Sequence, residues 1–255
     1  WHPGHYILNN LDETQTNELL TKFSDIPTFR GLQRIYYWSD IETSKGVYNF
    51  SAIDKDLATV KKYGRKLSII IHYKYKASPT KSSLPQYVLN LQPAKVGNLL
   101  VPAYFVQGKE GDGIYNVGDN ANFGHPGTLN AFDNLLKELA KKYDKDNSVS
   151  FLQFVETALG ANTTPELHKN FIDGTMTMNQ KARAAFVSTP LIQSVNFPRA
   201  RLNDMINNLA NNQMGFGGPD TFWGSFDDPK NALAFVSNTA PGVYHYNLKN
   251  YDSTK

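Results

Sequence analysis

A single glutamate, Glu156, stands at the end of a strongly apolar stretch of the sequence. The preceding run over 148–155, S-V-S-F-L-Q-F-V, has the aromatic and β-branched character of a parallel strand that is covered on both faces. Ligands bind at the carboxyl ends of such strands, so a carboxylate placed there is a candidate general acid or base. The alternative is that Glu156 pairs with a neighbouring Arg or Lys and only holds a loop.

Polar and aromatic side chains also accompany the ends of other strand-like segments. Aromatic faces stack on sugar rings, and Asn and His hydrogen-bond hydroxyl groups, so such a set suits a carbohydrate. Arg34 lies inside a predicted strand and needs a carboxylate partner, for which Glu156 is a candidate. Trp38 and His72 have the alternative of being ordinary buried residues. The candidate substrate-binding residues are Asn9, Arg34, Tyr37, Trp38, His72, Tyr73, Lys74, Asn196 and Trp223.

Strand-like and helix-like segments alternate along the chain. The predicted strands span 5–9, 30–39, 66–73, 148–160, 191–197 and 213–216. The predicted helices span 12–23, 50–63, 128–143, 165–186 and 199–211. This alternation implies a parallel sheet in a (β/α)8 barrel or in an open doubly wound fold. No G-x-G-x-x-G opens the first helix and no phosphate-binding P-loop occurs, which disfavours the open nucleotide-binding sheet. We therefore predict an α/β protein with a (β/α)8 TIM barrel, incomplete in that six β/α units are visible.

A long segment, 74–127, interrupts the alternation after the third strand. It is rich in Gly, Pro, Asn and Tyr, and the alternative to a long loop is that it contains short helices such as 84–91. A loop of this length inside a compact domain is usually functional. We expect 1–255 to form a single catalytic-type domain, with 74–127 as an insertion over the mouth of the barrel.

Composition excludes several classes of function. The net charge is only +3 and the basic residues are dispersed, so no nucleic-acid partner is expected. The absence of cysteine excludes disulfides and thiolate metal sites, and the six histidines form no H-x-x-x-H or H-x-H pair. We therefore expect no metal and no cofactor, and no apolar run is long enough to span a membrane. The low charged fraction, 19%, and the many Tyr and Asn residues favour a secreted or cell-surface protein that acts on carbohydrate. The first residue is Trp1 and not Met, so we expect a processed or trimmed N-terminus.

The stretch 31–71 resembles the second β/α unit of clan A glycoside hydrolases of the β-galactosidase type. It contains R-I-Y-Y-W-S-D-I-E-T-S-K-G-V-Y-N-F-S-A-I-D, followed by a helix and K-L-S-I-I-I. The shared pattern is an Arg-bearing strand, W-x-x-I-E-x-x-x-G-x-Y-x-F, and an Asp that opens a helix, here Asp54. The resemblance implies a TIM-barrel glycosidase whose acid/base glutamate, at the end of the fourth strand, maps onto Glu156. It also implies a structural role for Glu42. The chain has Val155 where the clan usually has Asn, and this puts a contact with the substrate 2-hydroxyl at risk.

A second departure concerns the nucleophile, which in this clan is a glutamate on the seventh strand. Six strands are visible here, and no glutamate follows Glu166. The chain is then a fragment, or an aspartate serves as the second carboxylate, or catalysis has been lost. Asp220 is the favoured aspartate, because its glycine-rich surroundings let the backbone approach a ligand closely. A helix cap in a tight turn is the alternative role of Asp220, and Asp227 and Asp228 are the alternative carboxylates.

The favoured hypothesis is a glycoside hydrolase that acts on a polysaccharide or oligosaccharide. Glu156 would be its general acid/base, and Asp220 its nucleophile or base. The alternative is a non-catalytic carbohydrate-binding barrel of a surface or phage-type protein, with Trp38, Tyr73 and Trp223 as stacking platforms. A third hypothesis is a lyase or phosphodiesterase that uses His72 and Lys74 on an acidic substrate.

Overall fold

The computed structural model describes residues 4–9, 11–74, 82–96, 98–110, 113–159, 165–196 and 198–217. Asp220 and Trp223, together with the alternatives Asp227 and Asp228, lie outside these described residues.

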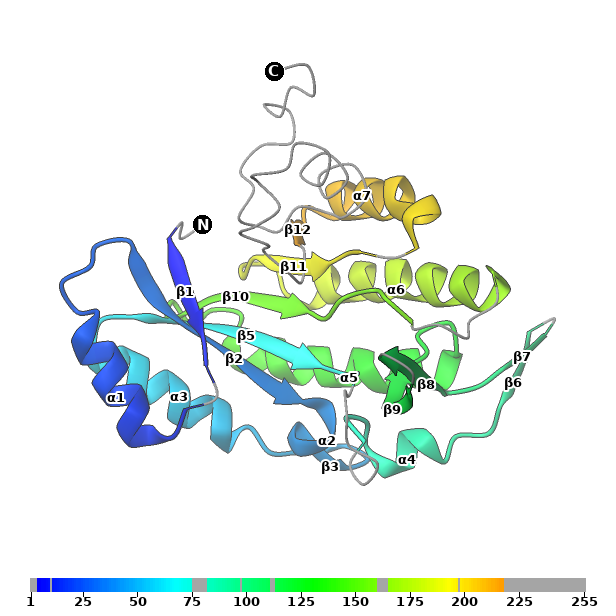
Figure 1. The fold of residues 1–255 in the computed structure, drawn as a ribbon, viewed down its shortest axis with the longest axis horizontal. Helices are drawn as coiled ribbons and strands as arrows, with labels where there is room; N and C mark the ends of the chain where they lie inside the picture. The colour runs from blue at the N-terminus through cyan, green and yellow to red at the C-terminus, as the bar shows by residue number, and fades with distance from the viewer. Residues whose placement is uncertain are drawn as a thin grey trace, which may run out of the picture.

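A six-stranded parallel sheet forms the centre of the fold and curls into part of a barrel (Figure 1). Its strands lie in the order β1 (His5–Leu8), β2 (Phe29–Tyr37), β5 (Lys66–His72), β10 (Val149–Phe154), β11 (Leu191–Ser194) and β12 (Gly215–Gly217). Spatial order follows chain order, as in a barrel, and all carboxyl ends meet at one edge. The predicted incomplete barrel of six β/α units is confirmed.

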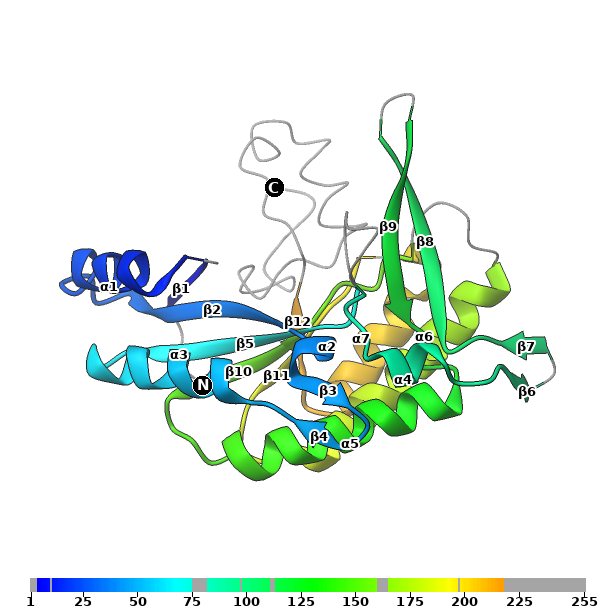
Figure 2. The ribbon, with the colours of Figure 1, turned by 90° about the horizontal axis from the view of Figure 1, so that it is seen from below.

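Helices connect the strands and cover one face of the sheet. They are α1 (Glu13–Lys22), α3 (Ser51–Lys62), α5 (Pro126–Tyr143), α6 (Pro165–Ala185) and α7 (Leu202–Asn211), the last preceded by the 3₁₀ turn Arg199–Arg201. Asp12 begins α1 with a capping box, in which its carboxylate accepts from the Gln15 amide at 2.9 Å. Figure 2 shows α3 and α5 along one side of the sheet, where their apolar residues enter the core.

Phe132 of α5 holds the core together beneath the carboxyl ends of the central strands. It is fully buried, and its ring centroid lies 4.9 Å from those of Trp38 and Phe123. The rings of Tyr73 and Phe154 lie 5.4 and 6.2 Å from it. Trp38 follows β2, Tyr73 follows β5 and Phe154 ends β10. The aromatic cluster therefore holds the carboxyl ends of these three strands, and the start of the loops that follow them, in fixed positions.

The segment between β2 and α3 folds into small elements of its own. The short helix α2 (Trp38–Ile41) leads into a hairpin of β3 (Glu42–Ser44) and β4 (Val47–Tyr48). Gly46 turns the hairpin at a φ of 75°, a conformation that favours glycine.

The insertion after the third strand is more ordered than the sequence suggested. Besides the short helix α4 (Gln86–Leu89), it forms two antiparallel hairpins. These are β6 (Ala94–Val96) with β7 (Asn98–Leu100), and β8 (Ala103–Glu110) with β9 (Gly113–Ala121). The sequence did not predict these two hairpins, and the β8–β9 hairpin projects from the body of the fold (Figure 2).

Among the helices of the described residues, none combines the length and the hydropathy that are needed to cross a membrane.

Candidate active site

Three polar side chains meet at the carboxyl edge of the sheet, one from each of three neighbouring strands. Lys74 follows β5, Glu156 follows β10 and Asn196 follows β11, each two positions after the last strand residue. We call Lys74, Glu156 and Asn196 the strand-end cluster. They meet because the strands are parallel and neighbouring, so the residues that follow them share the carboxyl edge of the sheet.

Glu156 is the centre of the strand-end cluster. Its Oε1 lies 3.1 Å from the ammonium of Lys74, and its Oε2 accepts a hydrogen bond from the Asn196 side-chain amide. The Glu156 side chain is 16% exposed and the Lys74 side chain 6%. Both donors favour the ionised carboxylate, and burial strengthens their effect because little water competes for it. The arrangement stabilises the negative charge that forms when this carboxyl releases a proton.

Arg34 does not belong to this cluster, and the expectation that Glu156 is its partner is wrong. Its guanidinium faces the helices, where it pairs with Asp56 of α3 at 3.2 Å and donates to the backbone oxygens of Asn9 and Leu11. The same Asp56 accepts from the Tyr36 hydroxyl at 2.7 Å. Burial, and then Asp56, raise the pKa of Tyr36. Arg34 therefore ties the first β/α unit to α3.

Two aromatic residues that were predicted to bind substrate are core residues instead. Trp38 is 0% exposed and Tyr73 1% exposed, and both contact Phe132. Burial raises the pKa of the Tyr73 hydroxyl, and the side chain of Gln193 hydrogen-bonds to it. Their assignment to the substrate site is corrected: neither ring can stack on a sugar. The hypothesis of a non-catalytic carbohydrate-binding barrel named three aromatic residues that would stack on the sugar, and two of them are therefore excluded.

The remaining predicted residues lie at the same edge of the sheet. The rings of Tyr37 and His72 pack edge to face at 5.1 Å, from the ends of β2 and β5. Asn9 follows β1 and is 8% exposed, and its side-chain amide has no hydrogen-bond partner within the described ranges. Their contact with a substrate stays a prediction.

Glu42 is a structural residue, as its motif indicates. It is 1% exposed and accepts hydrogen bonds from Trp38 Nε1 at 2.8 Å, from the Tyr87 hydroxyl at 2.8 Å and from the Gly46 amide at 2.9 Å. Burial, and then Glu42, raise the pKa of Tyr48 to about 12. Glu42 thus fixes the segment between β2 and α3.

The sequence reading missed Asn120, in β9. An antiparallel bridge joins Asn120 to Lys74, so their side chains leave the backbone toward the same side. Asn120 is 0% exposed, and its amide has no hydrogen-bond partner within the described part of the chain. A sequence signal existed, because the dipeptide Gly111-Asp112 between two strand-like runs is typical of a hairpin.

A row of polar side chains that the sequence reading also missed crosses the inner face of the barrel. Gln33 donates to Gln153 at 2.7 Å, and Gln153 donates to Ser194 at 3.0 Å. Gln33 also reaches Ser68 at 3.5 Å, so the row spans β2, β5, β10 and β11. The barrel interior below the strand-end cluster is hydrogen-bonded through side-chain amides.

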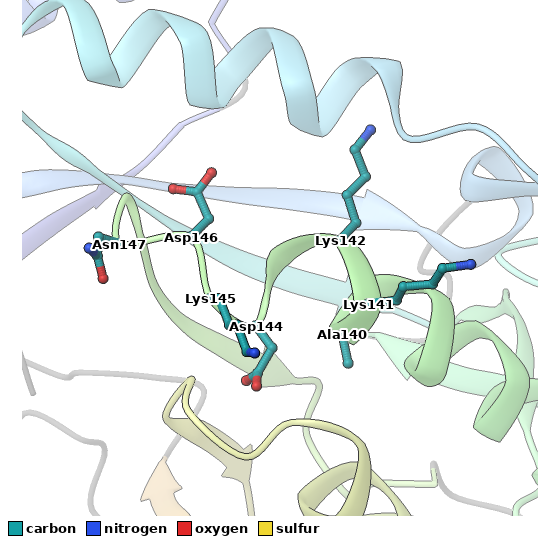
Figure 3. A pocket seen from close by; sticks show the side chains of 7 residues that line it. All are labelled: Ala140, Lys141, Lys142, Asp144, Lys145, Asp146 and Asn147. Atoms are coloured by element: carbon teal, nitrogen blue, oxygen red, sulfur yellow. The ribbon is translucent and has the colours of Figure 1, made fainter.

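A surface hollow of about 700 Å³ lies at the opposite end of the barrel, around the turn from α5 into β10 (Figure 3). Its charged groups serve the fold: Asp144 accepts from the amides of residues 187–189, and Asp146 pairs with Lys61 at 2.8 Å. Lys142 pairs with Asp54 at 2.5 Å. Residues at this end of a barrel sustain stability, and the catalytic groups lie at the other end.

Within the described residues, no group of three or more His, Asp or Glu side chains is arranged to hold a metal ion.

Comparison with known proteins supports the fold. No protein-family model and no curated protein matches the sequence. The structure is similar to a polyextremophilic β-galactosidase from the Antarctic haloarchaeon Halorubrum lacusprofundi, with a TM-score of 0.57 and 9% identity over 89% of this chain and 41% of that one. It also matches endo-glycoceramidase II from Rhodococcus sp., with a TM-score of 0.48 and 14% identity over 69% of this chain and 44% of that one.

The chain thus spans less than half the length of these solved structures. At this identity the similarity to the β-galactosidase, which covers most of the chain, establishes the fold. The resemblance noted over 31–71 is confirmed at the level of architecture. The chain forms a partial (β/α) barrel whose fold is similar to that of the β-galactosidase.

Proposed function

We propose that this chain is the catalytic-barrel portion of a glycoside hydrolase that cleaves O-glycosyl bonds in an oligosaccharide or polysaccharide, with Glu156 as general acid/base. One observation carries the proposal: Glu156 lies at the carboxyl end of β10, the fourth strand of the barrel, and neighbouring strands engage both of its oxygens. A carboxyl group placed there reaches a ligand at the barrel mouth. A secreted or cell-surface setting, as the composition favours, is part of the same proposal.

In the proposed reaction, Glu156 protonates the oxygen of the leaving group. The ammonium of Lys74 and the amide of Asn196 then stabilise the carboxylate that remains, which lowers the cost of the proton transfer. A second carboxylate attacks the anomeric carbon or activates a water molecule. Asp220 is the candidate for this role. A separation of about 5–5.5 Å between the carboxyl groups would give retention of configuration, and about 6.5–9.5 Å inversion.

The test compares Glu156→Gln with the unchanged chain on aryl glycosides and on oligosaccharides. A general acid matters most when the leaving group is poor. We therefore expect kcat/KM of Glu156→Gln to fall by about 10²–10⁴-fold on an oligosaccharide and far less on a dinitrophenyl glycoside. Glu138→Gln, on the outer helix α5, is the matched control and should keep full activity. Full activity of Glu156→Gln on both substrates would refute the proposal.

Asp220→Asn tests the second carboxylate on the same substrates. Loss of turnover on both leaving groups, with binding of the sugar kept, is the expected result for a nucleophile or base. Proton NMR of the first product then reports whether its anomeric configuration is retained or inverted. Unchanged turnover would leave another carboxylate to be found for this step.

A further inference from the structure

We propose that Lys74 is a positioning residue that holds Glu156 in one orientation and does not bind the sugar. The inference rests on the proposed function for its catalytic consequence, but the contact itself can be tested without turnover. It replaces the assignment of Lys74 as a substrate-binding residue.

The ammonium of Lys74 lies against two acceptors of one neighbouring loop. It donates to Glu156 Oε1, 3.1 Å away, and to the carbonyl oxygen of Ala158. Both acceptors belong to the loop that follows β10, whereas Lys74 follows β5. One side chain therefore fastens the loop that carries the carboxylate to the neighbouring strand at two points.

The Glu156 carboxylate is also held on its other side. Asn196 donates to Oε2 from β11, so the two oxygens have separate donors from the two strands that flank β10. Rotation of the carboxylate would break both contacts at once. A general acid needs this fixed orientation, because a displacement of about 1 Å can cost about 10²-fold in rate.

Burial of Lys74 also fits this role. Its side chain is 6% exposed, so its charge requires a close acceptor, which Glu156 provides. Lys181 offers a useful contrast on the outer layer: it pairs with Asp133 at the same N–O distance, 3.1 Å, but its side chain is 33% exposed. Two ion pairs of equal length thus differ in burial and in position.

A double-mutant cycle on the full chain tests the proposal. Lys74→Met should lower kcat by about 10²-fold with KM nearly unchanged, since the variant misplaces the acid and leaves sugar contacts intact. In the Glu156→Gln background, the same change should alter kcat/KM by less than about twofold, because two residues that act as a unit are not additive. Lys181→Met is the control and should leave kcat/KM unchanged in both backgrounds.

Binding gives a second readout. The dissociation constant of an oligosaccharide substrate, measured by calorimetry on Glu156→Gln, should stay within about twofold when Lys74→Met is added, as expected if the changed contact leaves the sugar untouched. A rise of about tenfold or more would show a lost sugar contact and overturn the proposal. Lys74→Met alone leaves a buried carboxylate without its cation. The double variant removes both charges, so the double variant is expected to be destabilised less than Lys74→Met.

The two proposals fail in distinguishable ways. If neither the unchanged chain nor any variant turns over a glycoside, the proposed function fails, and the Lys74–Glu156 contact is then judged by NMR of the ¹³C-labelled Glu156 carboxyl carbon. The chemical shift of that carbon is followed as a function of pH. Removal of the ammonium in Lys74→Met should move the midpoint of this curve to higher pH, whereas Lys181→Met should leave the midpoint in place. An identical midpoint in Lys74→Met would refute the positioning role.

Discussion

Asp144 at the base of the barrel offers a sharp test of how the fold is held together. Its carboxylate accepts from the backbone amides of Val187, Ser188 and Thr189 at 2.8–3.1 Å, and its residue is 8% exposed. Asp144→Asn keeps one acceptor oxygen. At least one amide then loses its protein acceptor, and the other hydrogen bonds lose their charge assistance. We expect the free energy of unfolding to fall by about 2–4 kcal/mol at pH 7.

The pH dependence of this loss follows from the pKa of Asp144. Burial raises that pKa, but the hydrogen bonds from Thr189, Ser188 and Val187 together lower it by a larger amount. The net result is a pKa below the ordinary value of 3.8. A lowered pKa in the folded state contributes stability that is present above the unfolded value and is lost as pH falls through the folded value. The difference between the unchanged chain and Asp144→Asn should therefore stay constant from pH 7 to about pH 4 and shrink below that.

Urea denaturation, followed by circular dichroism at several pH values, measures this difference. Asp25→Asn is the control, since Asp25 is exposed and should contribute less than about 0.5 kcal/mol. A difference below about 0.5 kcal/mol at pH 7, or one that persists undiminished at the lowest accessible pH, would refute the reasoning. In either variant kcat/KM should be unchanged, because this end of the barrel is structural.

Three other substitutions probe the elements beneath the site. Phe132→Ala should cost about 3–5 kcal/mol in urea denaturation, because it empties the centre of the aromatic cluster; the exposed Val187→Ala is its control, and an equal effect of both would contradict that role. Glu42→Gln should cost about 1–3 kcal/mol, since a neutral amide cannot replace three hydrogen bonds to a buried carboxylate, and kcat/KM should be kept; loss of turnover in the folded variant would contradict its structural role. Arg34→Met should cost about 2–4 kcal/mol through the uncompensated Asp56; the thermal midpoint should recover in part when Asp56→Leu is added, because Tyr36 then loses its acceptor, and no recovery would argue against the pair.

The order of strands and helices, and the meeting of Lys74, Glu156 and Asn196, could be predicted from the sequence. The reason is geometrical: in a parallel sheet, residues that follow the strands share one edge, whatever their side chains. The helices were predictable as well, because α5 carries a regular apolar stripe and α1 a capping residue.

The direction of individual side chains could not be predicted in the same way. Arg34 and Tyr73 lie on the helix-facing side of β2 and of the end of β5, where Asp56 and Phe132 receive them. Both faces of such strands are buried, so the usual alternation of apolar and polar residues that distinguishes inside from outside is missing. The face to which each side chain points is decided by partners on helices that are distant in sequence. The residue pattern of a single strand gives no information about those partners.

The row of amides across the barrel interior also fixes how the strands can align. The hydrogen bonds that link Gln33, Gln153 and Ser194 form only when the strands hold the observed register. Little water can replace these bonds, because Gln33 is 4% exposed and Ser194 2%. A slip of one strand by two residues would keep its apolar residues on the same faces, but it would leave a buried amide without a partner, at a cost of about 1–3 kcal/mol. The interior thus discriminates against misaligned pairings that hydrophobic burial alone would tolerate, and the meeting of Lys74, Glu156 and Asn196 at the carboxyl edge depends on that discrimination.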